Sequence, residues 1–180
     1  KRGSPIIFMV ALHDTIAAAA TSPGGSARGV VRISGSRVAE CMSAVFEADS
    51  STSIRDAHRR PTAFSGRLRI PQFASPIPCD LFYWPTAKSY TREPVAELHL
   101  IGSPTLVEAA LSAVCQFGAR IAEPGEFTLR AFLSGRIDLT QAEAVLGVID
   151  AGGHEQLDAA LAQLAGNIAL PLANLRDRLL

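Results

Sequence analysis

The stretch Gly29-Val30-Val31-Arg32-Ile33-Ser34-Gly35 decides the fold. Its β-branched residues lie between two glycines, which is typical of a strand that ends in turns. The segment after it carries apolar residues at the spacing of one helical face: Val38, Cys41, Met42, Val45 and Phe46. Ser36 is in position to cap this helix. The stretch therefore predicts a strand followed directly by a helix, and the rest of the chain is interpreted outward from this pair.

Further strands are predicted on both sides of this pair. They are short runs of β-branched or aromatic residues bounded by turn residues: Thr15–Ala20, Thr62–Ile70, Cys79–Trp84, Val95–Ile101 and Arg120–Ala122. The polar segment 49–61 is expected to be a loop. Helices are predicted after Ser103-Pro104, ending at Gly118, and over 127–133. Because strands come in pairs with helices between the pairs, the order predicts an α+β domain with a mixed or antiparallel sheet.

The character of the chain changes after Ile137. Thr140 and Glu143 form a possible capping box, and Gly152-Gly153 interrupts the helix that follows. The apolar side of that helix is expected to be made by Ala142, Val145, Leu146 and Ile149. A stripe at spacings of three and four then runs to the end, with Pro171 as a kink: Leu157, Leu161, Leu164, Ile168, Leu172, Leu175 and Leu179. Residues 137–180 are therefore predicted to start an all-α helical bundle, whose seam is covered by later helices or by a second chain.

Composition limits the class of protein. The chain has 180 residues, with 17 Lys plus Arg against 17 Asp plus Glu, and 48% hydrophobic residues. This predicts one packed domain, or one domain plus a piece of another, and argues against a strongly basic nucleic-acid binder. No apolar run reaches the ~20 residues that span a bilayer. The separated Cys41, Cys79 and Cys115 are expected to be buried thiols. Residues 1–8 are interpreted as a leader before a natural start at Met9, in a cytoplasmic protein.

The strong catalytic motifs are absent from the sequence. It contains no GxxxxGK[ST] phosphate loop, GxSxG, HExxH or GxGxxG motif. The four histidines form no pair at metal-ligand spacing, and each is expected to be a surface or structural residue: His13, His58, His99 and His154. Neither a metal enzyme nor a nucleophile–histidine hydrolase is therefore expected, and no catalytic or metal-binding residue is assigned.

Two charged residues lie inside predicted strands. Arg32 interrupts an apolar strand, and Glu97 lies within Val95–Leu100. Charged side chains are seldom buried unless they are paired. One interpretation is that the two face solvent or pair with each other. The other is a pocket for a polar, planar ligand, because a carboxylate accepts two parallel hydrogen bonds and an arginine clamps a carboxylate in the same forked way.

Several spaced blocks resemble the MnmE (TrmE) family of tRNA-modification GTPases. The longest is Ala122-Glu123-Pro124-Gly125-Glu126-Phe127-Thr128-Leu129-Arg130-Ala131-Phe132-Leu133-Ser134-Gly135-Arg136-Ile137-Asp138-Leu139-Thr140-Gln141-Ala142-Glu143-Ala144-Val145. The others are Asp14-Thr15-Ile16-Ala17, Val31-Arg32-Ile33-Ser34-Gly35, Ser89-Tyr90-Thr91-Arg92-Glu93 and Glu97-Leu98-His99. They occur in the family's order from about Met9 to the end of the chain.

The resemblance implies a function and a domain order. Residues 9–136 would be a folate-binding and dimerisation domain similar to aminomethyltransferase folate domains, and 137–180 the start of the helical domain. Its cofactor would be 5-formyl- or methylene-tetrahydrofolate. The family acts as a homodimer with an FAD-dependent partner (MnmG) and adds a carboxymethylaminomethyl-type group at C5 of the wobble uridine of tRNA. GTP, Mg²⁺ and K⁺ belong to a GTPase domain absent from these residues, so no GTPase activity is expected from this chain alone.

The resemblance also places the folate contacts. They fall on Arg32, Glu97 and Arg136, with Glu97 assigned to the pterin N–H edge and the arginines to carbonyl, formyl or glutamate oxygens. The family's lysine is replaced by Arg136, and a turn glycine is replaced by Arg92. The alternative is therefore a diverged dimerisation module that no longer binds folate; a self-sufficient aminomethyltransferase is a weaker third reading.

A small basic cluster is made by Arg55, Arg59 and Arg60. From the sequence alone, a solvated loop is the better interpretation of these arginines. This segment is therefore expected to engage tRNA only indirectly, and no membrane contact is expected.

Overall fold

The computed structural model describes residues 14–50, 54–57 and 59–165, and these form two compact units. The first unit is formed by the described residues up to Ser89 together with Glu93–Ala122. The second is formed by Tyr90–Arg92 and the described residues from Glu123 onward. The predicted leader and the last part of the leucine stripe lie outside the described residues. Among those described, no helix has the length and apolar character needed to cross a membrane.

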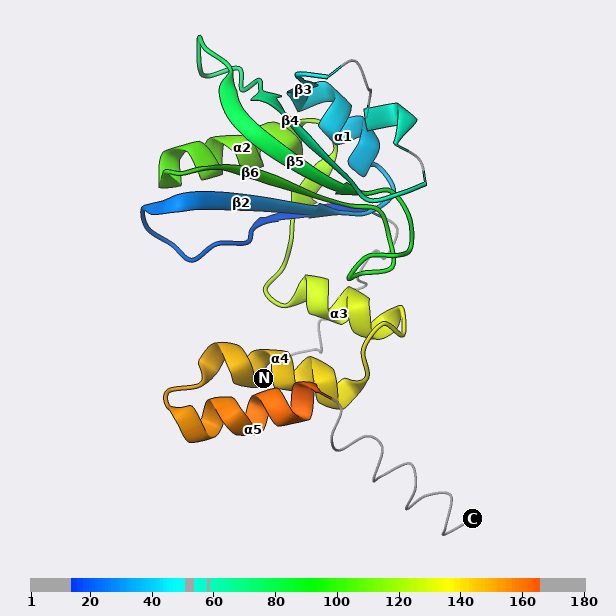
Figure 1. Cartoon of the computed structure of the whole chain (residues 1–180), viewed down its shortest axis with the longest axis vertical. Helices are drawn as coiled ribbons and strands as arrows, with labels where there is room; N and C mark the ends of the chain where they lie inside the picture. Colours follow the sequence, from blue (N-terminus) through cyan, green and yellow to red (C-terminus); the bar gives the residue numbers. More distant parts are fainter. Residues whose placement is uncertain (1–13, 51–53, 58, 166–180) are drawn as a thin grey trace, which may run out of the picture. The chain divides into compact units, whose positions relative to one another are not determined.

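The first unit is built on a mixed sheet (Figure 1). Its strands are β1 (Thr15–Ala19), β2 (Ser26–Ser34), β3 (Phe46–Ala48), β4 (Thr62–Leu68), β5 (Ile77–Trp84), β6 (Val95–Gly102) and β7 (Ala119–Ile121). They lie in the order β3-β4-β5-β6-β2-β1-β7. All neighbours are antiparallel except β1 and β7. The predicted α+β class with a mixed sheet is therefore confirmed.

Helices α1 (Val38–Val45) and α2 (Pro104–Gln116) pack on one face of this sheet. The alternation of side chains along a strand sends every second residue into this core. Val31, Ile33 and Leu98 are fully buried there, against helix residues such as Met42 and Ala110. The intervening residues of β2, β5 and β6 therefore project from the other face, which we name the polar face.

The predicted loop over 49–61 is preceded by a strand that the sequence pattern missed. Phe46 was expected on the face of the first helix, but α1 ends at Val45 and Phe46 begins β3. The helix pattern is correct up to that point. The strand is held by Gly66 of the neighbouring β4, where an added Cβ would collide with the carbonyl oxygen of Glu47. Close backbone approach of this kind leaves no periodic signal in so short a strand.

The second unit consists mainly of three helices, α3 (Glu126–Leu133), α4 (Leu139–Asp150) and α5 (His154–Leu164). Glu126 and Arg130 of α3 form a buried ion pair, with 3.0 Å between Oε1 and Nη2. Helices α4 and α5 pack through small residues, since Ala144 and Ala160 are buried and a Cβ on Gly147 would lie 3.2 Å from that of Ala160.

Two details of α4 differ from the prediction. Its N-cap is Asp138, whose carboxylate accepts from the N–H of Gln141 at 2.7 Å, and the Gln141 side chain completes the capping box. Thr140 and Glu143 therefore do not form it. The expected apolar side is also shifted, because Leu146 and Ile149 are exposed and Ala144 carries the buried contact. The small residues allow the α4 and α5 backbones to approach, which turns the larger residues away from that contact.

Candidate ligand site on the polar face

Strand pairing places the two charged residues of the sequence opposite each other. In the antiparallel pair β2–β6, Arg32 lies directly across from Glu97. Both alternate with buried residues, so both project from the polar face. Opposite charges on directly paired residues attract, and such cross-strand pairs stabilise a sheet.

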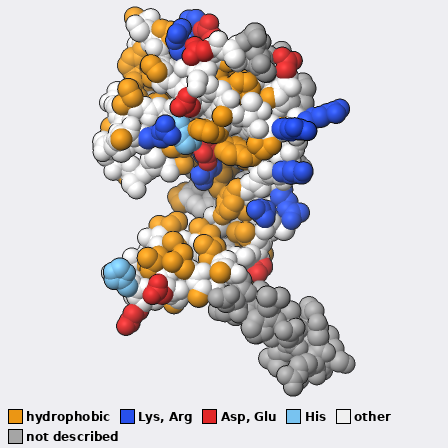
Figure 2. Space-filling view, viewed as in Figure 1, with side chains coloured by type: hydrophobic (Ala, Val, Ile, Leu, Met, Phe, Trp, Pro, Cys, Tyr) orange, Lys and Arg blue, Asp and Glu red, His pale blue; other side chains and the backbone are white. Residues whose placement is uncertain are grey.

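The two residues belong to a row of hydrogen-bonded side chains. Arg32 Nε donates to Glu97 Oε1 at 2.8 Å, and Glu97 Oε2 lies 3.1 Å from Nε2 of His99. The side chain of Arg32 is 38% exposed, whereas those of Glu97 and His99 are 17% and 16% exposed. Figure 2 shows a histidine beside acidic and basic side chains on this part of the molecule. The row is therefore reachable from solvent at its arginine end.

The protonation of the row follows from its contacts. Burial raises the pKa of Glu97, but hydrogen bonds from His99 and Arg32, with the charge of Arg32, outweigh burial and hold this pKa below its usual value. An ionised carboxylate only accepts hydrogen bonds, so Nε2 of His99 must be the donor. The row thus ends in a buried ring nitrogen, Nδ1 of His99, without a hydrogen-bond partner among the described residues.

Strand β5 adds an aromatic and an acidic residue to the same face. Phe82 pairs with Glu97 and Asp80 pairs with His99 in the β5–β6 register. The rings of Phe82 and His99 meet edge to face, with 4.7 Å between their centroids. An apolar ring next to the row excludes water from one side of it and strengthens its electrostatic interactions.

A shallow hollow lies at the far end of the row. It has a volume of about 340 Å³, and His99, Asp80, Ser65 and Arg28 are among its lining residues. Asp80 accepts from Ser65 Oγ at 3.0 Å and lies 3.8 Å from Arg28 Nη2. Cys79 also borders the hollow, but burial next to Asp80 raises the pKa of its thiol to about 12. The hollow therefore offers polar recognition groups and no reactive thiolate.

The third predicted residue, Arg136, belongs to the second unit. It is exposed and follows α3, and its backbone N–H donates to the carbonyl of Ala131 at 2.8 Å. The structure thus brings Arg32 and Glu97 together in the first unit, whereas Arg136 lies in the second unit. Whether it contributes to the same site stays a prediction.

His99 and Phe82 were not predicted as site residues. A signal for His99 existed, because it follows Glu97 by two positions in a strand and must share its face. No signal existed for Phe82, because its place beside the row depends on the register between β5 and β6. A pattern within one strand carries no information about that register.

The arrangement is suited to binding a polar ligand. No group of histidine, cysteine and carboxylate side chains among the described residues could hold a metal ion. A carboxylate offers two oxygens with about four acceptor positions, and a guanidinium offers five N–H donors in a fixed plane. Glu97 and Arg32 therefore present an acceptor and a donor side by side on the face of the sheet of an α+β domain.

Comparison with known sequences identifies the family of this domain. The family described as "GTP-binding protein TrmE N-terminus" matches residues 15–136. Since that match covers more than half of the chain, the chain belongs to this family. The residues matched include the whole sheet and the row on its polar face.

Curated relatives agree with this assignment. "tRNA modification GTPase MnmE" of Rhodopirellula baltica is 48% identical over 169 residues, which cover 93% of this chain and 35% of the relative. The proteins of that description in Heliobacterium modesticaldum and Alkaliphilus oremlandii are 42% and 39% identical, over 93% and 94% of this chain and 36% and 37% of their own lengths. The chain thus corresponds to the N-terminal region and spans little more than a third of these relatives.

Proposed function

We propose that this chain binds a tetrahydrofolate that carries a one-carbon unit, on the polar face of its sheet. The observation that supports the proposal is the row of Arg32, Glu97 and His99, which holds an ionised, mostly buried carboxylate on the polar face of the sheet. Ionisable groups with perturbed pKa values cluster at functional sites, which makes this carboxylate a candidate for ligand recognition.

The donor and acceptor pattern of the row fits a folate. A pterin presents an N–H edge that a carboxylate can bind with two parallel hydrogen bonds, and we assign Glu97 to this edge. Arg32 would bind the carbonyl, formyl or glutamate oxygens, and the same role is proposed for Arg136. The aromatic ring of Phe82, which contacts His99, offers an apolar surface beside the row. The bound folate would supply a 5-formyl or methylene group, and these residues would hold and orient it.

The role of the whole protein is part of the same proposal. The chain would form the dimerising N-terminal part of a cytoplasmic GTPase that acts with an FAD-dependent partner on C5 of the wobble uridine of tRNA. GTP, Mg²⁺ and K⁺ would be used by a domain outside these 180 residues, since the sequence contains no phosphate loop. The description of the relatives as tRNA-modification GTPases supports this role.

The assignment of Glu97 is tested by titrating 5-formyl-tetrahydrofolate into the chain and into Glu97→Gln. The variant keeps the shape of the side chain but loses its charge, and charge-assisted hydrogen bonds contribute about 1.5–3 kcal/mol each. We expect binding to weaken at least about tenfold, because each 1.4 kcal/mol is a factor of ten. Glu47→Gln is the matched control, since Glu47 pairs with Arg69 on the edge strand β3, away from the row. Equal affinity of Glu97→Gln and the unchanged chain would refute the assignment.

A further inference from the structure

Three positively charged residues lie at one end of the sheet, and the pattern within each strand does not predict that they lie at the same end. Arg59 and Arg60 precede β4, and Lys88 follows β5. Thr62, the first residue of β4, lies opposite Tyr83, near the end of β5. The chain before β4 and the chain after β5 therefore leave the sheet at the same end. We name Arg59, Arg60 and Lys88 the basic end.

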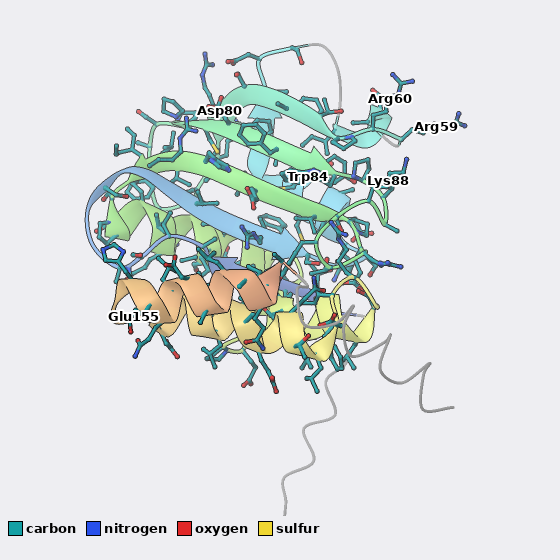
Figure 3. All side chains as sticks on the ribbon, turned by 60° about the horizontal axis from the view of Figure 1, so that its bottom comes forward. Arg59, Arg60, Asp80, Trp84, Lys88 and Glu155 are labelled. Carbon is teal, nitrogen blue, oxygen red and sulfur yellow. The ribbon has the colours of Figure 1, made fainter. Side chains whose placement is uncertain are left out.

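The three side chains point away from the body of the protein. Figure 3 shows Arg59, Arg60 and Lys88 at the same end of the sheet, with Asp80 at the opposite end of β5. All three are exposed. From the sequence alone, the arginines are best interpreted as a solvated loop, but the register adds a lysine from a segment 28 residues away in the sequence.

Among the described side chains of this unit, the basic end differs from six other positive groups in the carboxylate partners that those groups have. Six arginines of the unit form ion pairs with Asp or Glu: Arg28, Arg32, Arg37, Arg67, Arg69 and Arg120. Within the described part of the chain, Arg59, Arg60 and Lys88 form none. Three unpaired cations at one end of the sheet create a positive potential there, which favours an anionic partner.

The surroundings favour RNA as this partner. Trp84 ends β5 at the same end of the sheet and is only half-buried, and aromatic side chains beside cations are typical of nucleic-acid contacts (Figure 3). Trp84 pairs with Val95 at the start of β6, and Glu97 follows Val95 by two residues, which is about 7 Å along the strand. The proposed folate site therefore begins about 7 Å from this end of the sheet.

We propose that the basic end binds the phosphate backbone of the tRNA on which the whole protein acts. Phosphate contacts by Lys and Arg position a nucleic acid without reading its sequence. The identity of the RNA in this inference rests on the proposed function. The contact itself rests only on the residues of the basic end. Under this proposal the domain contacts tRNA directly, whereas the sequence alone led us to expect only an indirect contact.

The test measures binding of a fluorescently labelled, unmodified tRNA transcript by anisotropy at several salt concentrations. Three phosphate contacts give a slope of log K against log salt of about −2 to −3. We expect Arg59→Glu/Arg60→Glu to reduce the magnitude of that slope by about 2 and to weaken binding about tenfold or more at 50 mM salt. Lys88→Glu should remove about one further contact.

The control is Arg67→Glu/Arg69→Glu. These exposed arginines lie at the other end of β4, where they pair with Asp49 and Glu47. Both double variants replace two arginines by two glutamates, so they change the net charge of the chain equally. The proposal predicts that this control retains most of the affinity. Equal losses in both double variants, no binding by the unchanged chain, or equal competition by polyglutamate at the same charge concentration would each overturn it.

The outcome is separable from that of the proposed function. Arg59→Glu/Arg60→Glu should leave the affinity for 5-formyl-tetrahydrofolate unchanged, while Glu97→Gln should leave tRNA binding unchanged. If folate does not bind but Arg59→Glu/Arg60→Glu weakens tRNA binding as expected, the folate proposal is wrong and the proposed tRNA contact at the basic end is supported. Circular dichroism and thermal melting check that the variants are folded. Because Arg59 and Arg60 are exposed, we expect both measurements to be unchanged, and a loss of tRNA binding then reflects a lost contact.

Discussion

At the scale of single residues, Glu97 is a carboxylate that stays ionised although it is mostly buried. Its charge is maintained by two neighbours on the same face, Arg32 across the strand pair and His99 two positions along its own strand. The pair interpretation and the pocket interpretation of the sequence are therefore not exclusive. A cross-strand ion pair keeps the carboxylate ready to accept hydrogen bonds from a ligand.

This arrangement predicts how acid affects stability. Because the pKa of Glu97 is lowered in the folded protein, the carboxylate contributes stability above its unfolded pKa, and this contribution is lost as pH falls through the folded pKa. Glu97→Gln lacks this pH-dependent contribution to the free energy of unfolding. The difference in free energy of unfolding between the two proteins, measured with urea, should therefore be largest near pH 7 and shrink toward pH 3.5. A difference that is equal at both pH values would show that the row does not stabilise the ionised form.

Arg92 is a second residue whose backbone carries a prediction. Its φ of +57° is the one positive value at a non-glycine residue among those described. This left-handed conformation is strained for a side chain with a Cβ, whereas glycine adopts it freely. Arg92→Gly should raise the free energy of unfolding by about 0.5–1 kcal/mol, after the entropy of glycine in the unfolded chain is subtracted.

Arg92→Ala provides the control for that measurement. It removes the charge and the long side chain but keeps the Cβ, so no gain in stability is expected. If Arg92→Ala gained as much as Arg92→Gly in urea unfolding, the effect would come from the charge and not from the backbone.

At the scale of elements, the N-terminus of α4 tests the corrected capping box. The Asp138 carboxylate accepts from the N–H of Gln141 and from the hydroxyl of Thr140, both at 2.7 Å. Asp138→Ala should lower the free energy of unfolding by about 1 kcal/mol, which is typical for the loss of an N-cap. Glu143→Gln is the control, and we expect a change within about 0.5 kcal/mol. A larger loss from Glu143→Gln than from Asp138→Ala would favour the original sequence prediction.

The sequence predicts elements well where a periodic pattern is long and poorly where the fold depends on register. Val31, Ile33 and Leu98 alternate with polar residues, so β2 and β6 and their buried face were predictable. Arg32 and Glu97 were predictable as unusual charges and as part of a family motif. Their pairing with each other was one of the two interpretations that the sequence left open, and deciding for it requires the register between residues 65 positions apart. For the same reason the sequence did not predict the position of Phe82, the edge strand β3 or the placement of Lys88 at the same end of the sheet as Arg59 and Arg60.

At the scale of the whole molecule, the chain combines a complete sheet with a helical unit. The first unit contains the entire seven-stranded sheet and the row on its polar face. The second carries exposed apolar residues on α4, including Leu146 at 61% and Ile149 at 73% exposure. The family match ends at Arg136, whereas the change between compact units in the structure falls at Ala122. The predicted domain boundary at 136 stays a prediction.

The central claim is that the polar face binds a one-carbon folate, and calorimetric titration of the unchanged 180-residue chain with 5-formyl-tetrahydrofolate tests it most directly. The account predicts saturable binding that Glu97→Gln weakens at least about tenfold and Glu47→Gln leaves unchanged. The alternative, a dimerisation module that has lost its ligand, predicts no binding heat from a folded dimer. A titration without saturable binding by the folded, unchanged chain would contradict the account.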